Sequence, residues 1–271
     1  MFYEPHIDHV TLTCPRLPEA FEGLRLLHLS DLHISRWTRR LDSWRAALHS
    51  LSPDLIVMTG DLGHRAWTWK QTVAAIGKLL GGLHPALGIY FILGNHDTLK
   101  MAPALTGLGY MYLKNQSVIL AQPTYAPAGK NAPLSHLPDR GETGIHQPRL
   151  ALIGLDQHRR IDTDFPRALR QVHRDDFKLI LLHYPDLIHQ AAAAGADVCL
   201  AGHTHGGQIC WPDGHPIIRH DVLSQAMCTG VHKVADTWLV VNRGIGAAGL
   251  RIRVFCPPQA IMLTLRRTNE K

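Results

Sequence analysis

The sequence lacks any apolar run close to the roughly 20 residues that a membrane-spanning helix needs. Its first residues, MFYEPHIDHV, have neither the basic head nor the apolar segment of a secretory signal. Cysteine is also scarce: there are five, an odd number, and none forms a C-x-x-C pair. A disulfide framework or a cysteine-based structural zinc site is therefore not expected. We predict reduced, mostly buried thiols in a cytoplasmic protein.

Charged residues are few, at 18% of the 271 residues, whereas hydrophobic residues make up 45%. This composition excludes a disordered chain and leaves enough apolar material for a full core. The net charge of +6 favours anionic partners such as phosphates, nucleic acid or an acidic membrane surface, without choosing among them. Nucleic acid is not favoured, because no basic stripe with interleaved aromatic residues is present. Histidine, the commonest metal ligand, is abundant with 19 residues.

Short apolar runs end repeatedly in polar, glycine-rich turns, which is typical of buried strands. These runs cover residues 24–29, 55–58, 89–93, 179–182 and 198–201. Apolar residues at helical spacing predict helices over 37–51, 69–80 and 186–194. Strands that alternate with helices indicate an α/β fold, in which reactive groups gather at the carboxyl ends of the strands.

The remainder of the chain is less regular. Residues 121–149 are rich in proline and glycine and predict a long surface loop between strands at 118–120 and 150–154. Further strands are expected over 238–241 and 260–265. We predict a single domain over residues 1–271, with a motif-bearing core at about 24–210 and C-terminal strands at about 238–266.

Seven polar side chains follow the predicted strands: Asp31, His33, Asp61, Asn95, His183, His203 and His205. Taken singly, each has an ordinary explanation as a turn residue, a helix cap or a half-buried histidine. Taken together, they offer carboxylate, amide and imidazole ligands that suit Mn²⁺, Fe²⁺ or Zn²⁺. A Mg²⁺ or Ca²⁺ site would use more oxygens, and a closed structural zinc site usually contains thiolates. Buried without a metal, the set would leave uncompensated charge.

The pattern Asp31-Leu-His33, Gly60-Asp61, Gly94-Asn95-His96-Asp97, His183 and Gly202-His203-Thr-His205 resembles the calcineurin-like metallophosphoesterase family. The resemblance covers residues 24–210 in the family's order. It implies an α/β fold, a four-layer α/β/β/α sandwich of two mixed β-sheets flanked by helices, with the site at the sheet edge. Residues 238–265 would supply strands of the second sheet.

The resemblance also implies roles for the individual residues. The first of two divalent metal ions would bind Asp31, His33, Asp61 and His205, and the second would bind Asp61, Asn95, His183 and His203. Asp61 would bridge the two ions. His96 would face the scissile phosphate as a general acid or charge stabiliser, and Asp97 would orient it. One departure is that many relatives read G-D-x-x-D/E where this chain has Gly60-Asp61-Leu62-Gly63-His64.

Three further segments resemble a narrower group. His183-Tyr184-Pro185-Asp186, the run from His203 to Gln208, and the tail Arg243-Gly244 with Phe255-Cys256-Pro257-Pro258 are similar to bacterial phosphodiesterases of the YaeI and YkuE type. Some similar proteins are UDP-2,3-diacylglucosamine pyrophosphatases, enzymes of lipid A synthesis. Several relatives begin with a membrane-anchoring or export segment that this sequence does not show. Besides a free cytoplasmic location, the resemblance therefore allows a peripheral location at the inner face of the membrane.

These observations predict a hydrolase with a dinuclear metal centre. We expect a phosphodiesterase or pyrophosphatase that acts on a lipid-linked or nucleotide-type phosphodiester. The alternatives are a nuclease, a metal-bound non-catalytic scaffold and a phosphoprotein phosphatase. Two ions about 3.5–4 Å apart can lower the pKa of a bridging water towards neutrality, which produces the attacking hydroxide.

Two segments beside the metal motifs are rich in aromatic and basic residues. We predict that Arg36, Trp37 and Arg39 after the first motif, and Trp67 and Trp69 after the second, contact the substrate. Tryptophan favours membrane interfaces, and arginine pairs with phosphate through two hydrogen bonds. In the alternative, the tryptophans simply pack the starts of the next helices.

Overall fold

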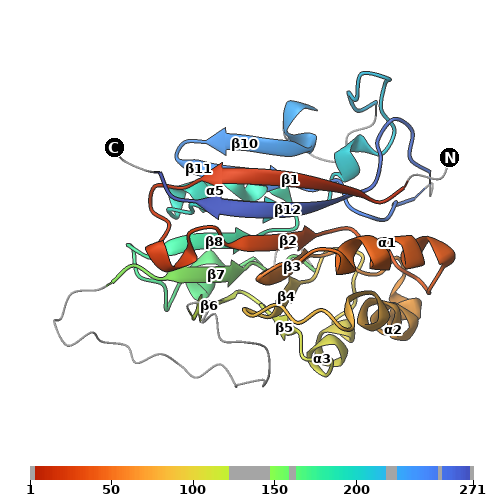
Figure 1. Cartoon of the computed structure of the whole chain (residues 1–271), viewed down its shortest axis with the longest axis horizontal. Helices are drawn as coiled ribbons and strands as arrows, with labels where there is room; N and C mark the ends of the chain where they lie inside the picture. Colours follow the sequence, from red (N-terminus) through yellow and green to blue (C-terminus); the bar gives the residue numbers. More distant parts are fainter. Residues whose placement is uncertain (1–3, 122–146, 159–162, 218–224, 250–251, 269–271) are drawn as a thin grey trace.

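The computed structural model describes residues 4–121, 147–158, 163–217, 225–249 and 252–268. The predicted loop at 121–149 falls almost wholly outside these residues. Within them, the chain forms two six-stranded β-sheets (Figure 1). None of the described helices is long and apolar enough to cross a membrane. All five cysteines are buried free thiols, as predicted.

The first sheet has the strand order β1-β12-β2-β3-β4-β5. Its strands are β1 (His6–Thr13), β2 (Arg25–Leu29), β3 (Leu55–Thr59), β4 (Ile89–Ile92), β5 (Met111–Tyr112) and β12 (Gln259–Arg266). Strands β2 to β5 are parallel, whereas β12 runs antiparallel to β2 and parallel to β1. The first sheet is therefore mixed.

The second sheet has the order β10-β11-β9-β8-β7-β6. Its strands are β6 (Gln116–Leu120), β7 (Leu150–Gly154), β8 (Phe177–Leu181), β9 (Val198–Ala201), β10 (Gly230–Val234) and β11 (Thr237–Val241). The four inner strands are parallel, and the edge strands β6 and β10 are antiparallel to their neighbours. The second sheet is thus mixed as well.

Helices cover the outer face of each sheet. The first sheet carries α1 (Arg39–His49), α2 (Trp69–Leu80) and α3 (Met101–Thr106), and the second carries α4 (Phe165–Ala168) and α5 (Ile188–Ala193). Short 3₁₀ turns complete the chain: η1 (Glu19–Phe21), η2 (Ala66–Thr68), η4 (Pro185–Leu187), η5 (His205–Gly207) and η6 (Gln225–Cys228).

The burial of successive strand residues shows how the layers stack. In β2, Leu26 belongs to the core between the sheets, whereas Leu27 packs under the helices of the first sheet. In β8, Leu179 faces the same inter-sheet core and Ile180 faces the helices of the second sheet. Strands buried on both faces read as continuous apolar runs, which is why the sequence reveals them. The predicted four-layer α/β/β/α sandwich is confirmed, whereas the single-domain organisation stays a prediction.

Several elements differ from the sequence-based expectation. Strand β1 was not predicted, because most of its residues are exposed or half-buried and it lacks an apolar run. Strands β5 and β10 and helices α3 and α4 were missed for similar reasons of shortness or exposure. The helix predicted over 37–51 spans only Arg39–His49. The helix predicted over 186–194 is divided into η4 and α5.

The inter-sheet core predicts a clear stability effect. Leu200 on the central strand β9 is fully buried between the sheets. Leu200→Ala should lower the free energy of unfolding by about 2–5 kcal/mol, because it removes apolar contacts and leaves a cavity. Leu108→Ala is a matched control, since Leu108 is 47% exposed, and should change stability by about 0.5 kcal/mol or less. Urea unfolding measures both, and equal losses would contradict the assigned core.

Candidate metal centre

The structure brings all seven predicted ligands together at one edge of the two sheets. Asp31 and His33 follow β2, Asp61 follows β3, and Asn95 follows β4. His183 follows β8, while His203 and His205 follow β9. Because these strands are parallel within each sheet, their carboxyl ends meet at the same edge. The backbone N–H of His203 donates to Asp31 Oδ2 at 2.9 Å and links the two sheets there.

The backbone of the site is held in an unusual conformation. Nine described residues other than glycine have positive φ, and five of them are predicted ligands: Asp31 (47°), His33 (44°), Asp61 (51°), His203 (69°) and His205 (52°). Such angles are uncommon for residues with a side chain and cost free energy. Five of these strained residues lie at one edge of the sheets. The free-energy cost of their positive φ angles is therefore linked to directing their side chains at a common point.

Two glycines of the motifs are required by close approach. A Cβ on Gly94 would collide with the carboxylate of Asp61, and a Cβ on Gly202 would collide with the Ser30 hydroxyl and the Asp31 carboxylate. The loops of the motifs therefore pack against the ligands of neighbouring loops. This explains why glycine precedes Asn95 and His203 in the sequence.

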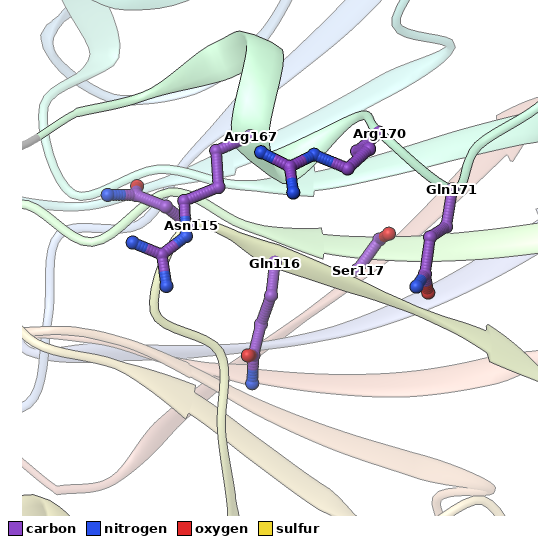
Figure 2. A pocket seen from close by; sticks show the side chains of 6 residues that line it. All are labelled: Asn115, Gln116, Ser117, Arg167, Arg170 and Gln171. Carbon is purple, nitrogen blue, oxygen red and sulfur yellow. The ribbon is translucent and has the colours of Figure 1, made fainter.

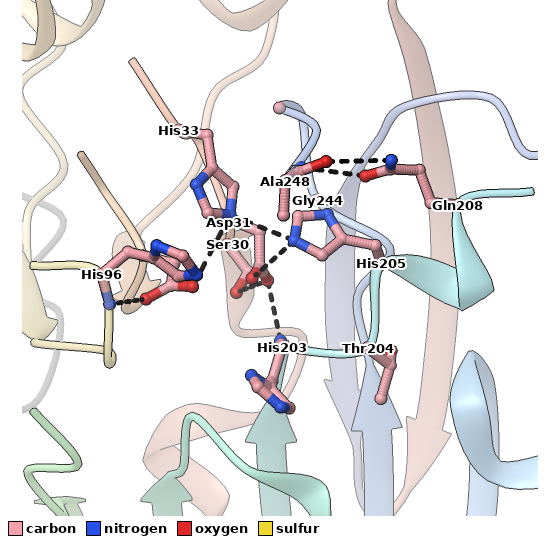
Figure 3. Close-up of polar contacts among 12 residues, drawn as sticks. Ser30, Asp31, His33, His96, His203, Thr204, His205, Gln208, Gly244 and Ala248 are labelled. Atoms are coloured by element: carbon pink, nitrogen blue, oxygen red, sulfur yellow. Dashed lines mark hydrogen bonds and ion pairs between the residues drawn. The ribbon is translucent and has the colours of Figure 1, made fainter. Parts of the chain in front are cut away.

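Asp31, His33 and His205 form the first candidate metal-binding group. One ligand atom from each lies within 4.8 Å of the others. The Nε2 atoms of His33 and His205 are 3.0 Å apart, and His205 Nε2 is 3.6 Å from Asp31 Oδ1 (Figure 3). Asp31 Oδ1 is buried without a hydrogen-bond partner, whereas Oδ2 accepts a hydrogen bond from Ser30. A cation between these atoms would satisfy the oxygen and both imidazoles.

Asp61, His183 and His203 form the second candidate group, again with ligand atoms within 4.8 Å of one another. The amide oxygen of Asn95 lies 3.0 Å from His183 Nε2 and joins the group. His183 Nδ1 is 2.8 Å from the carbonyl of Thr59, to which it can donate. That hydrogen bond leaves the lone pair on Nε2 for a metal.

Asp61 lies between the two groups. Its Oδ1 is 3.4 Å from His183 Nε2, whereas its Oδ2 is 3.6 Å from His33 Nε2. Each carboxylate oxygen therefore faces a different group. This is the arrangement that a bridging ligand needs.

Burial and mutual proximity control the charges of the site. Burial raises the pKa of Asp31 to about 6, against the opposing effect of His183. Burial also opposes ionisation of Asp61, but His183 and His33 outweigh it and hold the pKa of Asp61 below its usual value. Burial lowers the pKa of His33 to about 3 and that of His205 well below its usual value. Neutral imidazoles are the form that binds metal.

The loop after β4 carries the two residues predicted to act beside the metals. His96 is exposed, its backbone N–H donates to Asp61 Oδ1 at 2.9 Å, and its ring centroid is 5.1 Å from that of His33. Asp97 is buried and accepts hydrogen bonds from the backbone N–H groups of Gly63 and Gly94. Asp97 therefore fastens two motif loops together, and its orientation of His96 stays a prediction. Burial, with a contribution from Asp61, raises the pKa of Asp97 to about 7.

Three supporting residues were not found by sequence reasoning. Arg253 is buried and donates to the backbone carbonyls of Gly246 and His205, and its Nη2 lies 3.3 Å from His205 Nδ1. Gln157 accepts hydrogen bonds from the backbone N–H groups of His183 and the next residue. His64, noted only as a departure from the family pattern, has its ring centroid 5.7 Å from that of His33. Gln157 lies shortly after the strand predicted over 150–154, and a polar residue at that place is the one sequence signal that could have indicated its role.

The predicted substrate residues lie in the loops that follow the first two motifs. A bridge between Ile34 and Gly63 holds these loops side by side. Trp67 is 73% exposed, and the guanidinium carbon of Arg65 is 5.2 Å from its ring. Trp37 and Trp69 instead pack partly against the core under α1 and α2. Arg36 and Arg39 are exposed.

Comparison with known proteins agrees with this geometry. The family model described as calcineurin-like phosphoesterase matches residues 24–207. The metallophosphoesterase YkuE of Bacillus subtilis is 27% identical, over 99% of this chain and 89% of its own. The UDP-2,3-diacylglucosamine pyrophosphatase LpxG of Chlamydia trachomatis is 28% identical, over 96% of this chain and 89% of its own. Both relatives confirm the narrower resemblance predicted from the sequence.

Among solved structures, the phosphopantetheinyl hydrolase PptH of Mycobacterium tuberculosis is similar, with a TM-score of 0.44 and 10% identity. The similarity covers 81% of this chain and 88% of that chain. The family model, for its part, spans more than half of the present chain. The chain therefore belongs to the calcineurin-like phosphoesterase family, whose members are metal-dependent phosphohydrolases.

Proposed function

We propose that this protein hydrolyses a phosphodiester or pyrophosphate bond at a dinuclear centre of Mn²⁺, Fe²⁺ or Zn²⁺. The observation that carries the proposal is the position of Asp61, whose two oxygens face two separate ligand groups. The first ion is assigned to Asp31, His33, Asp61 and His205. The second is assigned to Asp61, Asn95, His183 and His203. The nitrogen and oxygen donors of both groups suit these metals.

Divalent ions held by these residues would supply Lewis acidity, which would lower the pKa of a bound water and neutralise charge on the phosphate. The protein's own residues position and complete this chemistry. His96 is exposed beside His33 and can donate a proton to the leaving oxygen or stabilise charge on the phosphate. Its backbone hydrogen bond to Asp61 fixes its distance from the centre. Asp97 keeps this loop closed on the loop that carries Asp61.

For the substrate, we favour a lipid-linked phosphodiester or pyrophosphate over a soluble nucleotide. One support is the similarity to LpxG, which is named for a diacylated nucleotide sugar. A second is the exposed Trp67 beside Arg65 on the loop after the Asp61 motif. An indole next to a guanidinium suits a ligand that has both acyl chains and phosphate.

Two neighbouring segments also carry exposed apolar side chains, which support the same substrate class. They hold five large exposed side chains: Trp211, Ile217, Ile252, Val254 and Phe255. The segments are joined by a hydrogen bond from Cys210 N to Val254 O at 2.9 Å. Paired hydrogen bonds between Gln208 and Ala248 anchor both segments beside His205 (Figure 3). Large exposed apolar patches mark interaction or membrane sites.

These surfaces also support peripheral contact with a membrane, which we place at the cytoplasmic face. Tryptophan is favoured at membrane interfaces because its ring is apolar and its N–H is polar. Trp67 is 73% exposed and Trp211 is 58% exposed. Together with the net charge of +6, they would attract the protein to an anionic lipid surface that presents the substrate.

Substitutions of Asp61 and His96 test the proposed mechanism. Asp61→Ala should abolish hydrolysis of a soluble aryl phosphodiester and lower the metal content, because it removes the ligand shared by both groups. His96→Ala should reduce turnover about 10²–10⁴-fold while both ions stay bound, because His96 acts on the substrate. Turnover and metal content are measured on the same purified samples. The control is His84→Ala, which alters a histidine in the turn between α2 and β4.

Two results would count against the assignment. Loss of both ions from His96→Ala would make His96 a ligand rather than a catalytic group. Normal turnover in Asp61→Ala would remove the bridging role and with it the dinuclear proposal. The His84→Ala control should match the parent protein in both measurements.

The lipid hypothesis predicts a difference between two substrates. Replacing Trp67 and Trp211 together by alanine should leave turnover of a soluble aryl phosphodiester near normal. The same double variant should lose at least tenfold in kcat/KM on a lipid-linked nucleotide sugar, because each indole contributes apolar contact area. Leu108→Ala serves as an exposed apolar control in the turn after α3. Equal effects on both substrates, or no activity of the parent on the lipid-linked compound, would reject the hypothesis.

A further inference from the structure

A polar groove of about 230 Å³ lies between α4 and the edge strand β6, outside the metal centre. Its walls are formed by six residues: one just before β6, two from the start of β6, and three from α4 and the turn that follows it (Figure 2). They are Asn115, Gln116, Ser117, Arg167, Arg170 and Gln171. None of these residues belongs to the family motifs, and no role follows for them from the proposed hydrolysis.

The described side chains that line the groove carry only positive charge. They include the guanidinium groups of Arg167 and Arg170 and no carboxylate. Within the described part of the chain, neither guanidinium forms a salt bridge or a hydrogen bond. Asp164, which is close in sequence, accepts a hydrogen bond from the backbone N–H of Arg167 at the start of α4. Among the residues that the structure describes, the two cations therefore have no counter-ion.

The back wall of the groove is rigid. Asn115 is buried, and its Oδ1 accepts a hydrogen bond from Asp156 N at 3.1 Å. Asp156 is also buried, and its Oδ1 accepts a hydrogen bond from Leu93 N at 3.2 Å. A ligand in the groove would contact a wall that is already ordered. Binding would therefore cost little free energy for ordering that wall.

The lining residues indicate the chemistry of the ligand. Arginine pairs with phosphate through charge-assisted hydrogen bonds, and the hydroxyl of Ser117 and the amide of Gln171 can add neutral ones. Among the described residues, no aliphatic or aromatic side chain lines the groove, which favours a polar ligand over an apolar one. Its volume of about 230 Å³ leaves room for a phosphate and an attached polar group.

We propose that the groove between α4 and β6 is a second anion site, which binds a phosphate-bearing small molecule outside the metal centre. The site depends on Arg167 and Arg170 for charge and on Asn115 for a fixed wall. It does not rest on the hydrolytic function, because the groove shares no residue with the two metal-binding groups.

Calorimetric titration of the metal-loaded protein with inorganic phosphate tests the site. The parent should show binding at the metal centre and a second binding event in the groove. Arg167→Gln combined with Arg170→Gln should weaken the second event at least tenfold, since two charge-assisted contacts are lost. Ser117→Asp should weaken it as well, because it places a carboxylate in the groove while leaving both arginines unchanged.

Two further variants identify which event belongs to which site. Arg174→Gln is the matched control, because Arg174 is an exposed arginine near α4 that does not line the groove, and it should bind phosphate like the parent. Asp61→Asn should impair the event at the metal centre and preserve the event in the groove. A parent titration without a second event, or unchanged phosphate binding in the double arginine variant, would overturn the proposal whatever the outcome for hydrolysis.

Discussion

Two fully buried carboxylates, Asp31 and Asp61, lie within one cluster of buried imidazoles, and the free-energy cost of burying these charges governs the architecture around them. An ionised group in a protein interior must be compensated by a partner charge or by hydrogen bonds. Here one oxygen of Asp31 has no hydrogen-bond partner, and the Nε2 atoms of His33 and His205 point at one another. Cations at this point would compensate the buried carboxylates, the unpartnered oxygen and the facing imidazole nitrogens together.

The surrounding fold is arranged to hold the cluster against this cost. Parallel strands from both sheets bring the ligand-bearing loops to one edge, and positive φ angles aim five of the side chains. Gly94 and Gly202 permit neighbouring loops to approach closely. Arg253 ties the turn at Gly244 and Gly246 to His205 through backbone carbonyls. Stability for this arrangement comes from the apolar core between the sheets, away from the site.

The sequence predicts the inner strands and the ligands well, for a common physical reason. Strands such as β3 and β8 are buried on both faces, so they appear as unbroken apolar runs, and the ligands directly follow such runs. Strand β1 escapes prediction because it is half-exposed, and its place beside β12 depends on residues more than 250 positions away. Arg253 cannot be predicted as a site residue, because it donates hydrogen bonds to backbone carbonyl groups, which leave no pattern in the sequence. The partial burial of Trp37 and Trp69, compared with the exposure of Trp67, depends on helix packing that spacing alone does not determine.

The central claim is that two metal ions act together across Asp61. The most direct measurement is a titration of chelator-treated protein with Mn²⁺, in which bound metal and hydrolysis of a soluble aryl phosphodiester are followed in the same samples. The account predicts no activity without metal and full activity only when two ions are bound per chain. Full activity in metal-free protein, or saturation of activity at one ion per chain, would contradict it.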